Sequence, residues 1–155
     1  MIVRSSTPDD VAGMTALLNA VIAVGGTTAH QLPMTEDRVR HAYVDGPDVL
    51  SSVVAITAGH VIGWQAVELW DGDPHIGTFV LPGQQARGVG SALFALTCPL
   101  LRQRGTRHVL AYIRADNRPG LAYYARIGFC DIGGDPDFTL TDGTRTGRIH
   151  RRFDL

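Results

Sequence analysis

The most constraining feature of this chain is a short glycine-containing run, Gln85-Ala86-Arg87-Gly88-Val89-Gly90. An apolar segment with strand character, residues 76–81, precedes the run, and a segment with helical spacing of its leucines follows it. A loop that leads from a strand into a helix places unpaired backbone N–H groups at the start of the helix. Gly88 and Gly90 have no Cβ and let a phosphate approach the backbone, while Arg87 adds a charged donor. The run therefore fits a pyrophosphate, although a tight turn without a ligand has the same pattern.

Two common phosphate-binding motifs do not match this run. A dinucleotide-binding loop has a third small residue near position 93 and an acidic residue on the next strand, but Leu93 is large and residues 107–113 contain no acid. A P-loop needs a lysine, and all 14 basic residues of the chain are arginine. A phosphate site here must therefore be of another kind.

The order of the expected elements indicates a mixed α/β domain with a partly antiparallel sheet. Residue patterns and turn signals predict a short strand that opens at Ile2-Val3 and ends by Thr7, a helix from Pro8 to Gly25-Gly26, a helix from Thr35 to near Asp45, strands at 49–57, 61–70 and 76–81, a helix from after Pro82 to Gly105, a strand at 107–113, a helix at 118–127 and two strands after Phe129. With 155 residues and 45% hydrophobic content, we expect one domain over residues 1–155.

Two motifs in the second half of the chain resemble those of the GNAT N-acetyltransferases. The run 85–90 resembles their acetyl-coenzyme A pyrophosphate loop, Gln/Arg-x-x-Gly-x-Gly/Ala. Asn117, Tyr124 and Gly128-Phe129 resemble their downstream Asn…Tyr-x-x-x-Gly-Phe segment. The resemblance covers essentially the whole chain. It implies an α/β GNAT fold, with a single mixed, largely antiparallel, twisted sheet of about seven strands flanked by about four helices, and acetyl-coenzyme A as co-substrate.

Three shorter segments resemble a narrower branch of that superfamily, the phosphinothricin and methionine-sulfoximine acetyltransferases. These segments are Gly26-Thr27-Thr28-Ala29, Thr78-Phe79-Val80, and Asp142-Gly143 before Arg148. The resemblance implies direct transfer of the acetyl group to the primary amine of a small molecule, an amino acid or an analogue of one.

The resemblance also implies which residues bind acetyl-coenzyme A. They are Phe79, Val80, Gln85, Ala86, Arg87, Gly88, Val89, Gly90, Ser91, Asn117 and Tyr124. The loop residues bind the pyrophosphate, and the backbone N–H of Val80 polarises the thioester carbonyl where its strand separates from a neighbour. Asn117 binds the pantetheine arm, and its position before a helix also predicts a cap.

Tyr124 is the candidate catalytic acid. A phenol with a pKa of about 10 can protonate a thiolate if the proton moves as the thiolate departs. The alternative is a core tyrosine on an amphipathic helix, which is the role expected for Tyr123.

Two residues are candidates for the catalytic base, and the sequence does not choose between them. In the resembling family a carboxylate often stands near the start of the strand before the glycine loop, and His75 occupies about that place; it could equally be an exposed turn residue. Glu68 shares a strand face with Trp64 and Trp70 by the two-residue period, so it could be the base or a cross-strand ion-pair partner.

The loop from Gly25 to Met34 is expected to cover the acceptor site. Thr27, Thr28 and His30 are the candidate acceptor-binding residues, although His30 could be an ordinary surface residue. The other histidines, at positions 41, 60, 108 and 150, have no metal-ligand spacing. They are interpreted as structural, and no metal site is expected.

Charge and hydropathy limit the classes of binding partner that the chain is expected to have. The net charge is −1 and no segment concentrates positive charge, so nucleic acid is not an expected partner. No segment reaches transmembrane length and no signal peptide is evident, which predicts a cytoplasmic protein without a membrane partner. Cys98 and Cys130 are expected to be buried, reduced thiols. A homodimer is an expectation of the family resemblance only.

Two other functions remain open from the sequence. A non-catalytic acyl-coenzyme A sensor would keep the loop but lack a competent base, and position 75 is not a carboxylate. An acetyltransferase acting on protein N-termini would need an open groove for a peptide.

Overall fold

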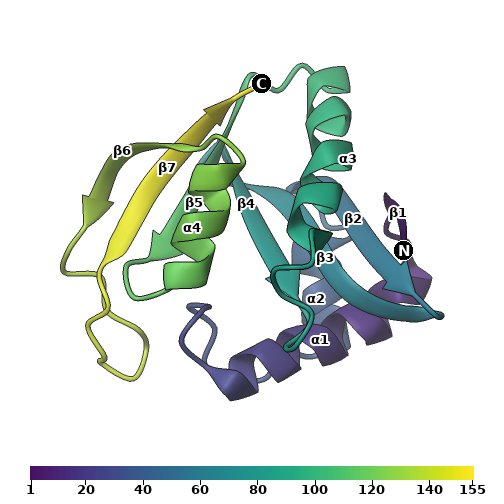
Figure 1. The fold of residues 1–155 in the computed structure, drawn as a ribbon, viewed down its shortest axis with the longest axis horizontal. Helices are drawn as coiled ribbons and strands as arrows, with labels where there is room; N and C mark the ends of the chain where they lie inside the picture. The colour runs from purple at the N-terminus through teal and green to yellow at the C-terminus, as the bar shows by residue number, and fades with distance from the viewer.

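The computed structural model describes residues 1–155 and has seven strands and four α-helices around one sheet (Figure 1). Along the chain the elements are β1 (Ile2–Ser5), a 3-10 turn (Pro8–Asp10), α1 (Val11–Val24), α2 (Glu36–Tyr43), β2 (Val49–Thr57), β3 (His60–Trp70), β4 (Asp73–Val80), α3 (Val89–Gln103), β5 (His108–Arg114), α4 (Arg118–Arg126), β6 (Cys130–Asp135) and β7 (Arg148–Asp154). The expected α/β class, strand number and helix number are confirmed.

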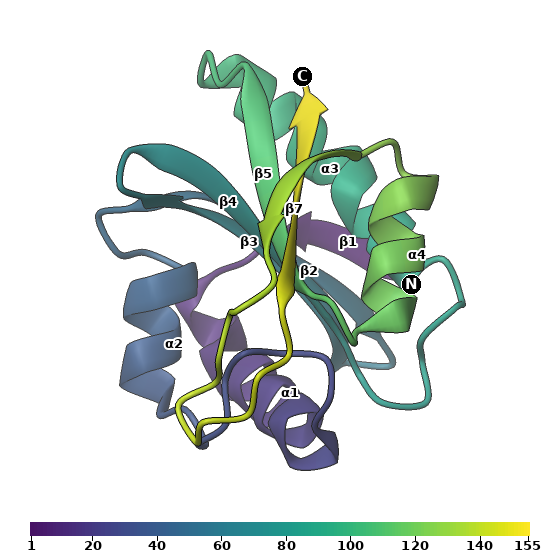
Figure 2. The same cartoon turned by 90° about the vertical axis from the view of Figure 1, so that its left-hand side faces the viewer.

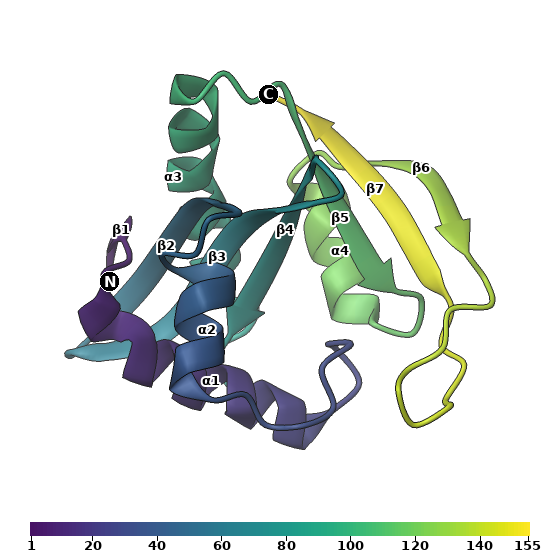
Figure 3. The ribbon, with the colours of Figure 1, turned by 180° about the vertical axis from the view of Figure 1, so that it is seen from behind.

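The sheet has the order β1-β2-β3-β4-β5-β7-β6 and is antiparallel at every junction except one. Strands β4 and β5 are parallel, and their register pairs a single residue of each, His75 with Leu110. Beyond this pair the two strands separate toward their carboxyl ends, as Figures 1 and 3 show. The opening leaves backbone groups on the facing edges of both strands without a strand partner.

Helices cover both faces of the sheet, and the two-residue alternation of β2 shows how. Val54 packs with α1 and α2 in one buried cluster that also contains Trp64. Its neighbours Val53 and Ala55 point to the opposite face, where they pack against Val89 of α3. Helices α3 and α4 thus lie on one face, and α1 and α2 lie on the other (Figure 1).

Local sequence signals account for most of the element boundaries. The side chain of Thr35 caps α2 by accepting a hydrogen bond from Arg38 N–H at 3.3 Å, as expected. The helix expected from Pro8 starts as a 3-10 turn and becomes α-helical at Val11. Cys98 is buried, but Cys130 is exposed on the edge strand β6, so the expectation that both thiols are buried was wrong for Cys130.

Candidate active site

The glycine loop enters α3 with a backbone that only small residues tolerate. Gly88 is the N-cap of α3 and has φ +79°, in the left-handed region that favours glycine. The first helical hydrogen bond runs from Ala92 N–H to the Gly88 carbonyl. The N–H groups of residues 89–91 therefore precede the hydrogen-bond ladder and are free to face an anion at the positive end of the helix.

Gly90 is required for a different reason, which is the closeness of Tyr123. A Cβ added at Gly90 would lie 2.7 Å from Cε2 of Tyr123. The Tyr123 hydroxyl donates to the Gly90 carbonyl at 2.8 Å, so α4 is fixed to the first turn of α3. The sequence did not indicate Tyr123 as a site residue, because its contact with Gly90 joins two distant segments and leaves no local pattern.

A cleft of about 400 Å³ lies beside this loop, between the end of β4 and α4. Its lining includes ten of the eleven residues that the resemblance implied for acetyl-coenzyme A: Phe79, Val80, Gln85, Ala86, Gly88, Val89, Gly90, Ser91, Asn117 and Tyr124. Arg87 is exposed and does not line the cleft. The cleft also includes residues that the sequence did not indicate, among them Thr78, Tyr123 and Arg126. The guanidinium of Arg126 adds a positive charge at this site.

Tyr124 is buried and also borders the cleft, so its position is compatible with both a core tyrosine and a catalytic acid. Its hydroxyl lies 2.9 Å from Oγ1 of Thr78, and Gln65 Nε2 donates to the same Oγ1 at 2.8 Å. Burial raises the pKa of Tyr124 above its ordinary value, which keeps the phenol protonated at neutral pH. The phenol thus carries the proton that an acid needs, but its raised pKa requires the proton to move as the thiolate departs.

Asn117 connects the cleft with the loop between α1 and α2. Its Oδ1 accepts from Gly120 N–H at 3.0 Å, which confirms the expected cap of α4. Its Nδ2 donates to the Thr27 carbonyl at 3.1 Å, and Thr27 itself lines the cleft.

The loop expected to cover the acceptor site is fixed on the side of α1 and α2 by contacts with distant segments. Arg114 Nη1 donates to the Thr28 carbonyl at 2.9 Å. His30 Nε2 lies 2.7 Å from the Tyr43 hydroxyl, and His30 is half-buried, so it is not an ordinary surface residue. Figure 2 shows this loop beside the connection between β6 and β7, where the Gln31 side chain accepts from Thr141 Oγ1 at 2.6 Å. The loop therefore closes one side of the opening between β4 and β5.

His75 lies inside β4 at the pair with Leu110 and is only 5% exposed. The interpretation as an exposed turn residue is therefore wrong, because β4 begins at Asp73 rather than at Ile76. Burial is the main cause that lowers the pKa of His75, so its imidazole is neutral at pH 7. Its Nδ1 is buried and has no hydrogen-bond partner.

Glu68 lies directly across from His75 in the β3–β4 ladder, so both side chains are on the face of α1 and α2. Its Oε1 accepts from Trp70 Nε1 at 3.1 Å, and its buried Oε2 has no partner. No arginine or histidine lies within ion-pair distance, so the ion-pair interpretation of Glu68 was wrong. Burial raises the pKa of this carboxyl to about 8.

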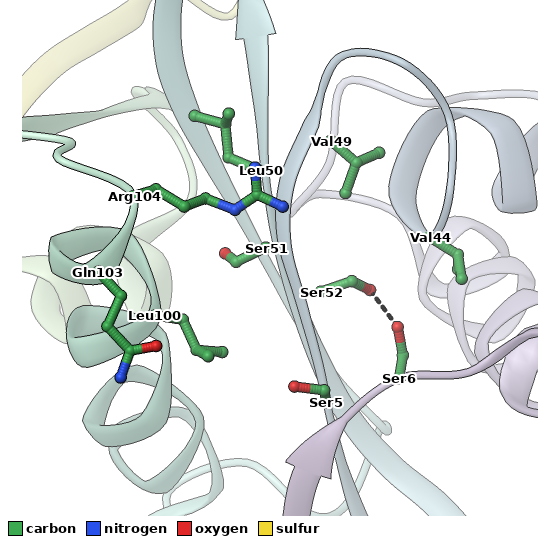
Figure 4. Close-up of a pocket in the computed structure, with 10 residues that line it drawn as sticks. All are labelled: Ser5, Ser6, Val44, Val49, Leu50, Ser51, Ser52, Leu100, Gln103 and Arg104. Carbon is green, nitrogen blue, oxygen red and sulfur yellow. Dashed lines mark hydrogen bonds between the residues drawn. The ribbon is translucent and has the colours of Figure 1, made fainter.

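A second cavity, of about 310 Å³, lies at the other end of α3 (Figure 4). It is lined by serines of β1 and β2, by aliphatic side chains and by Gln103 and Arg104. Arg104 is its only titratable residue, so this cavity offers no acid–base pair. The cleft beside the glycine loop, which Tyr124 borders, is therefore the candidate active site.

Comparison with known protein families identifies the class of protein to which this fold and glycine loop belong. The model of the acetyltransferase (GNAT) family matches residues 15–129. The chain belongs to this family.

Individual relatives point to two groups within the family. A mycothiol acetyltransferase of Clavibacter sepedonicus is 36% identical over 106 residues, which cover 66% of this chain and 34% of the relative. The chain thus spans about one third of the length of the mycothiol acetyltransferases that it matches. YwnH of Bacillus subtilis, a candidate phosphinothricin acetyltransferase, is 26% identical over 94% of this chain and 93% of its own length.

Solved structures support the fold over the whole chain. A phosphinothricin acetyltransferase from Sinorhizobium meliloti in complex with acetyl-coenzyme A matches with a TM-score of 0.84 at 18% identity, over 99% of this chain and 88% of that one. The structure of yncA from Salmonella typhimurium, a candidate acetyltransferase with acetyl-coenzyme A, matches with a TM-score of 0.83 at 18% identity, over 100% of this chain and 94% of that one.

None of the helices in the structure has the length and apolar character needed to cross a membrane. No group of three or more histidine, cysteine, aspartate or glutamate side chains is arranged to hold a metal ion.

Proposed function

We propose that this chain binds acetyl-coenzyme A in the cleft beside the glycine loop and transfers the acetyl group to the primary amine of a small molecule, an amino acid or an analogue. One observation carries the proposal. The cleft runs from the anion-binding start of α3 to the buried pair of Tyr124 and Thr78 at the opening between β4 and β5. It thus joins a phosphate site to a proton donor.

The residues present fit acetyl-coenzyme A in three places. The N–H groups of residues 89–91 would hold the pyrophosphate, and Asn117 would face the pantetheine arm. Leu81 N–H donates to Ile62 of the neighbouring segment, so the alternation of the strand turns Val80 N–H to the open edge that faces β5. A free backbone donor at this edge can polarise the thioester carbonyl.

Acetyl transfer also requires a neutral amine. An alkylammonium with a pKa of about 10.4 is neutral in about one molecule in 2500 at pH 7, a cost of about 4.6 kcal/mol. Glu68 or His75 would take the proton of the amine, and Tyr124 would give a proton to the departing thiolate. Each candidate base has a buried atom without a hydrogen-bond partner on the sheet face of α1 and α2. These atoms are Oε2 of Glu68 and Nδ1 of His75.

Thermal unfolding with the donor and thiol release with amines test the proposal. Acetyl-coenzyme A at about 100 times its Kd should stabilise the fold by about 2.7 kcal/mol and raise Tm. Addition of amino acids or other small amines should then release free coenzyme A thiol. An unchanged Tm at saturating donor would refute the binding, and thiol release that no amine accelerates would refute the transfer.

The two alternative functions predict different results in the same assays. An acyl-coenzyme A sensor would show the rise in Tm without amine-dependent thiol release. An N-terminal acetyltransferase would prefer short peptides to free amino acids.

We further propose a single catalytic domain over residues 1–155, a cytoplasmic location and a homodimer, of which only the homodimer is an expectation of the family resemblance. Limited proteolysis, cell fractionation and sedimentation equilibrium test them in turn.

A further inference from the structure

Arg148 of β7 is a half-buried cation without a counter-ion. Its guanidinium carbon lies 4.9 Å from the centre of the Tyr112 ring and 4.3 Å from that of Phe138, so two rings hold it between them. Three arginines of the chain are not fully exposed, and two of them, Arg114 and Arg151, have carboxylate partners. Arg148 has none within 4.0 Å, and its Nε is buried without a hydrogen-bond partner. Asp135 is its register partner on β6 but forms no ion pair with it.

Arg148 lies on the same sheet face as three other unpartnered polar atoms. These buried atoms are Oε2 of Glu68, Nδ1 of His75 and Nε2 of His150. A continuous series of ring contacts links their strands: Trp70 with His75 at 4.2 Å, His75 with Tyr112 at 4.5 Å, and Tyr112 with His150 at 3.7 Å between ring centres. Four of the seven unpartnered buried side-chain atoms of the chain thus belong to one cluster.

Such a cluster is costly unless a ligand completes it. A buried polar atom without a partner loses the hydrogen bonds that water would provide, and a partly buried cation also lacks a countercharge. The pKa of Glu68 is raised to about 8 by burial, so this carboxyl is protonated at pH 7 and supplies no negative charge. Arg114 is not an alternative cation, because Asp116 and the Thr28 carbonyl occupy its nitrogens.

We infer that Arg148, together with His150, binds an anionic group of the acceptor, while the amine of the same molecule faces Glu68 and His75. Arg148 and His150 would then select amino acids and their analogues, the acceptors proposed above, over amines that carry no anion. A carboxylate matches the planar donor edge of a guanidinium best. This inference rests on the proposed acetyl transfer.

The test compares matched acceptors in the wild-type protein and in R148Q. Each pair consists of an amino acid and the amine that lacks its carboxylate, for example methionine with 3-(methylthio)propylamine and phenylalanine with phenethylamine. The substitution should lower kcat/KM for the amino acids by about 10- to 100-fold, mainly through KM, and leave the simple amines nearly unchanged. R148K keeps the positive charge but loses the two parallel N–H donors of the guanidinium. Its kcat/KM for the amino acids should therefore lie between those of the wild type and R148Q.

Arg145→Gln is the matched control, because Arg145 is exposed and pairs with Asp137 in the connection between β6 and β7. It should leave both acceptor classes unchanged. Equal losses for amino acids and amines in R148Q, or no loss for either, would overturn the inference and leave acetyl transfer standing.

Calorimetric titration of the same compounds into the protein with coenzyme A provides a second measurement that does not need turnover. Binding of the amino acids that R148Q weakens supports the anion site even if no transfer occurs, in which case only the proposed function fails. If none of the amino acids binds the wild-type complex, the inference is wrong.

Discussion

The buried carboxyl of Glu68 predicts a pH-dependent stability that can be measured without knowledge of the acceptor. Burial raises its pKa from 4.5 to about 8, and the hydrogen bond from Trp70 Nε1 offsets only part of that effect. In the unfolded chain the carboxyl ionises at its ordinary pKa. Between these two values the unfolded state is ionised while the folded state is still protonated. The contribution of Glu68 is therefore fully present below pH 4.5 and is lost as the pH rises toward 8.

The size of the effect follows from the two pKa values. With 1.36 kcal/mol per pKa unit, the linked loss of stability between pH 5 and pH 8 is at most about 3.5 kcal/mol. Solvent reaches part of this half-buried side chain and screens it, so we expect about 2 kcal/mol. Glu68→Gln removes the titration and keeps the shape of the side chain. Urea unfolding of both proteins at pH 5 and pH 8 should therefore show that the wild type loses about 2 kcal/mol more than the variant.

The comparison between the two proteins is needed because buried histidines titrate in the same range. Their contribution is common to both proteins and cancels. Glu36→Gln, on the exposed first turn of α2, controls for the loss of a negative charge. Parallel pH profiles for the wild type and Glu68→Gln would refute a raised pKa at this carboxyl.

Three further predictions concern the reaction. Tyr124→Phe should lower kcat by at least about 10-fold and change KM little, and an unchanged kcat would remove the tyrosine as the acid. Gly90→Ala should weaken acetyl-coenzyme A binding and lower stability by about 1–3 kcal/mol, because the new Cβ meets Tyr123 at 2.7 Å; urea unfolding and donor titration measure both. If Glu68 is the base, kcat/KM should rise with pH to a midpoint of about 8. If His75 is the base, the midpoint should lie below pH 6.5. Substitution of the residue that acts as the base should abolish the rise of kcat/KM with pH, which identifies it.

Local signals in the sequence were sufficient for much of the fold and for the glycine loop and helix cap that border the cleft. The caps Thr35 and Asn117, and the strand that leads into a glycine loop, depend on residues within a few positions of one another. Helix starts and turns are set by such short-range hydrogen bonds and by backbone sterics. For this reason the predicted boundaries at these places agree with the structure to within a few residues.

The acceptor side could not be predicted in the same way, because distant strands build it. Arg148 and His150 reach Glu68 and His75 only through the pairing of β5 with β7 and the proximity of β4 to β5. The sequence contains a signal for two of them, since positions 148 and 150 share one face of a strand. The sequence does not reveal the order of the strands in the sheet. That order determines which residues lie next to positions 148 and 150.

The single residue pair between β4 and β5 has a mechanical consequence. The sheet divides into two parts, β1 to β4 and β5 with β7 and β6, whose register meets only at the pair of His75 with Leu110, so we expect any hinge motion of the sheet at this pair (Figure 3). Across the gap, the two parts are tied by the hydrogen bonds from Asn117 to Thr27, from Arg114 to Thr28 and from Thr141 to Gln31. The width of the gap therefore depends on these hydrogen bonds as well as on the His75–Leu110 pair. Gln31 does not line the cleft beside the glycine loop, yet its loss should loosen the opening between β4 and β5.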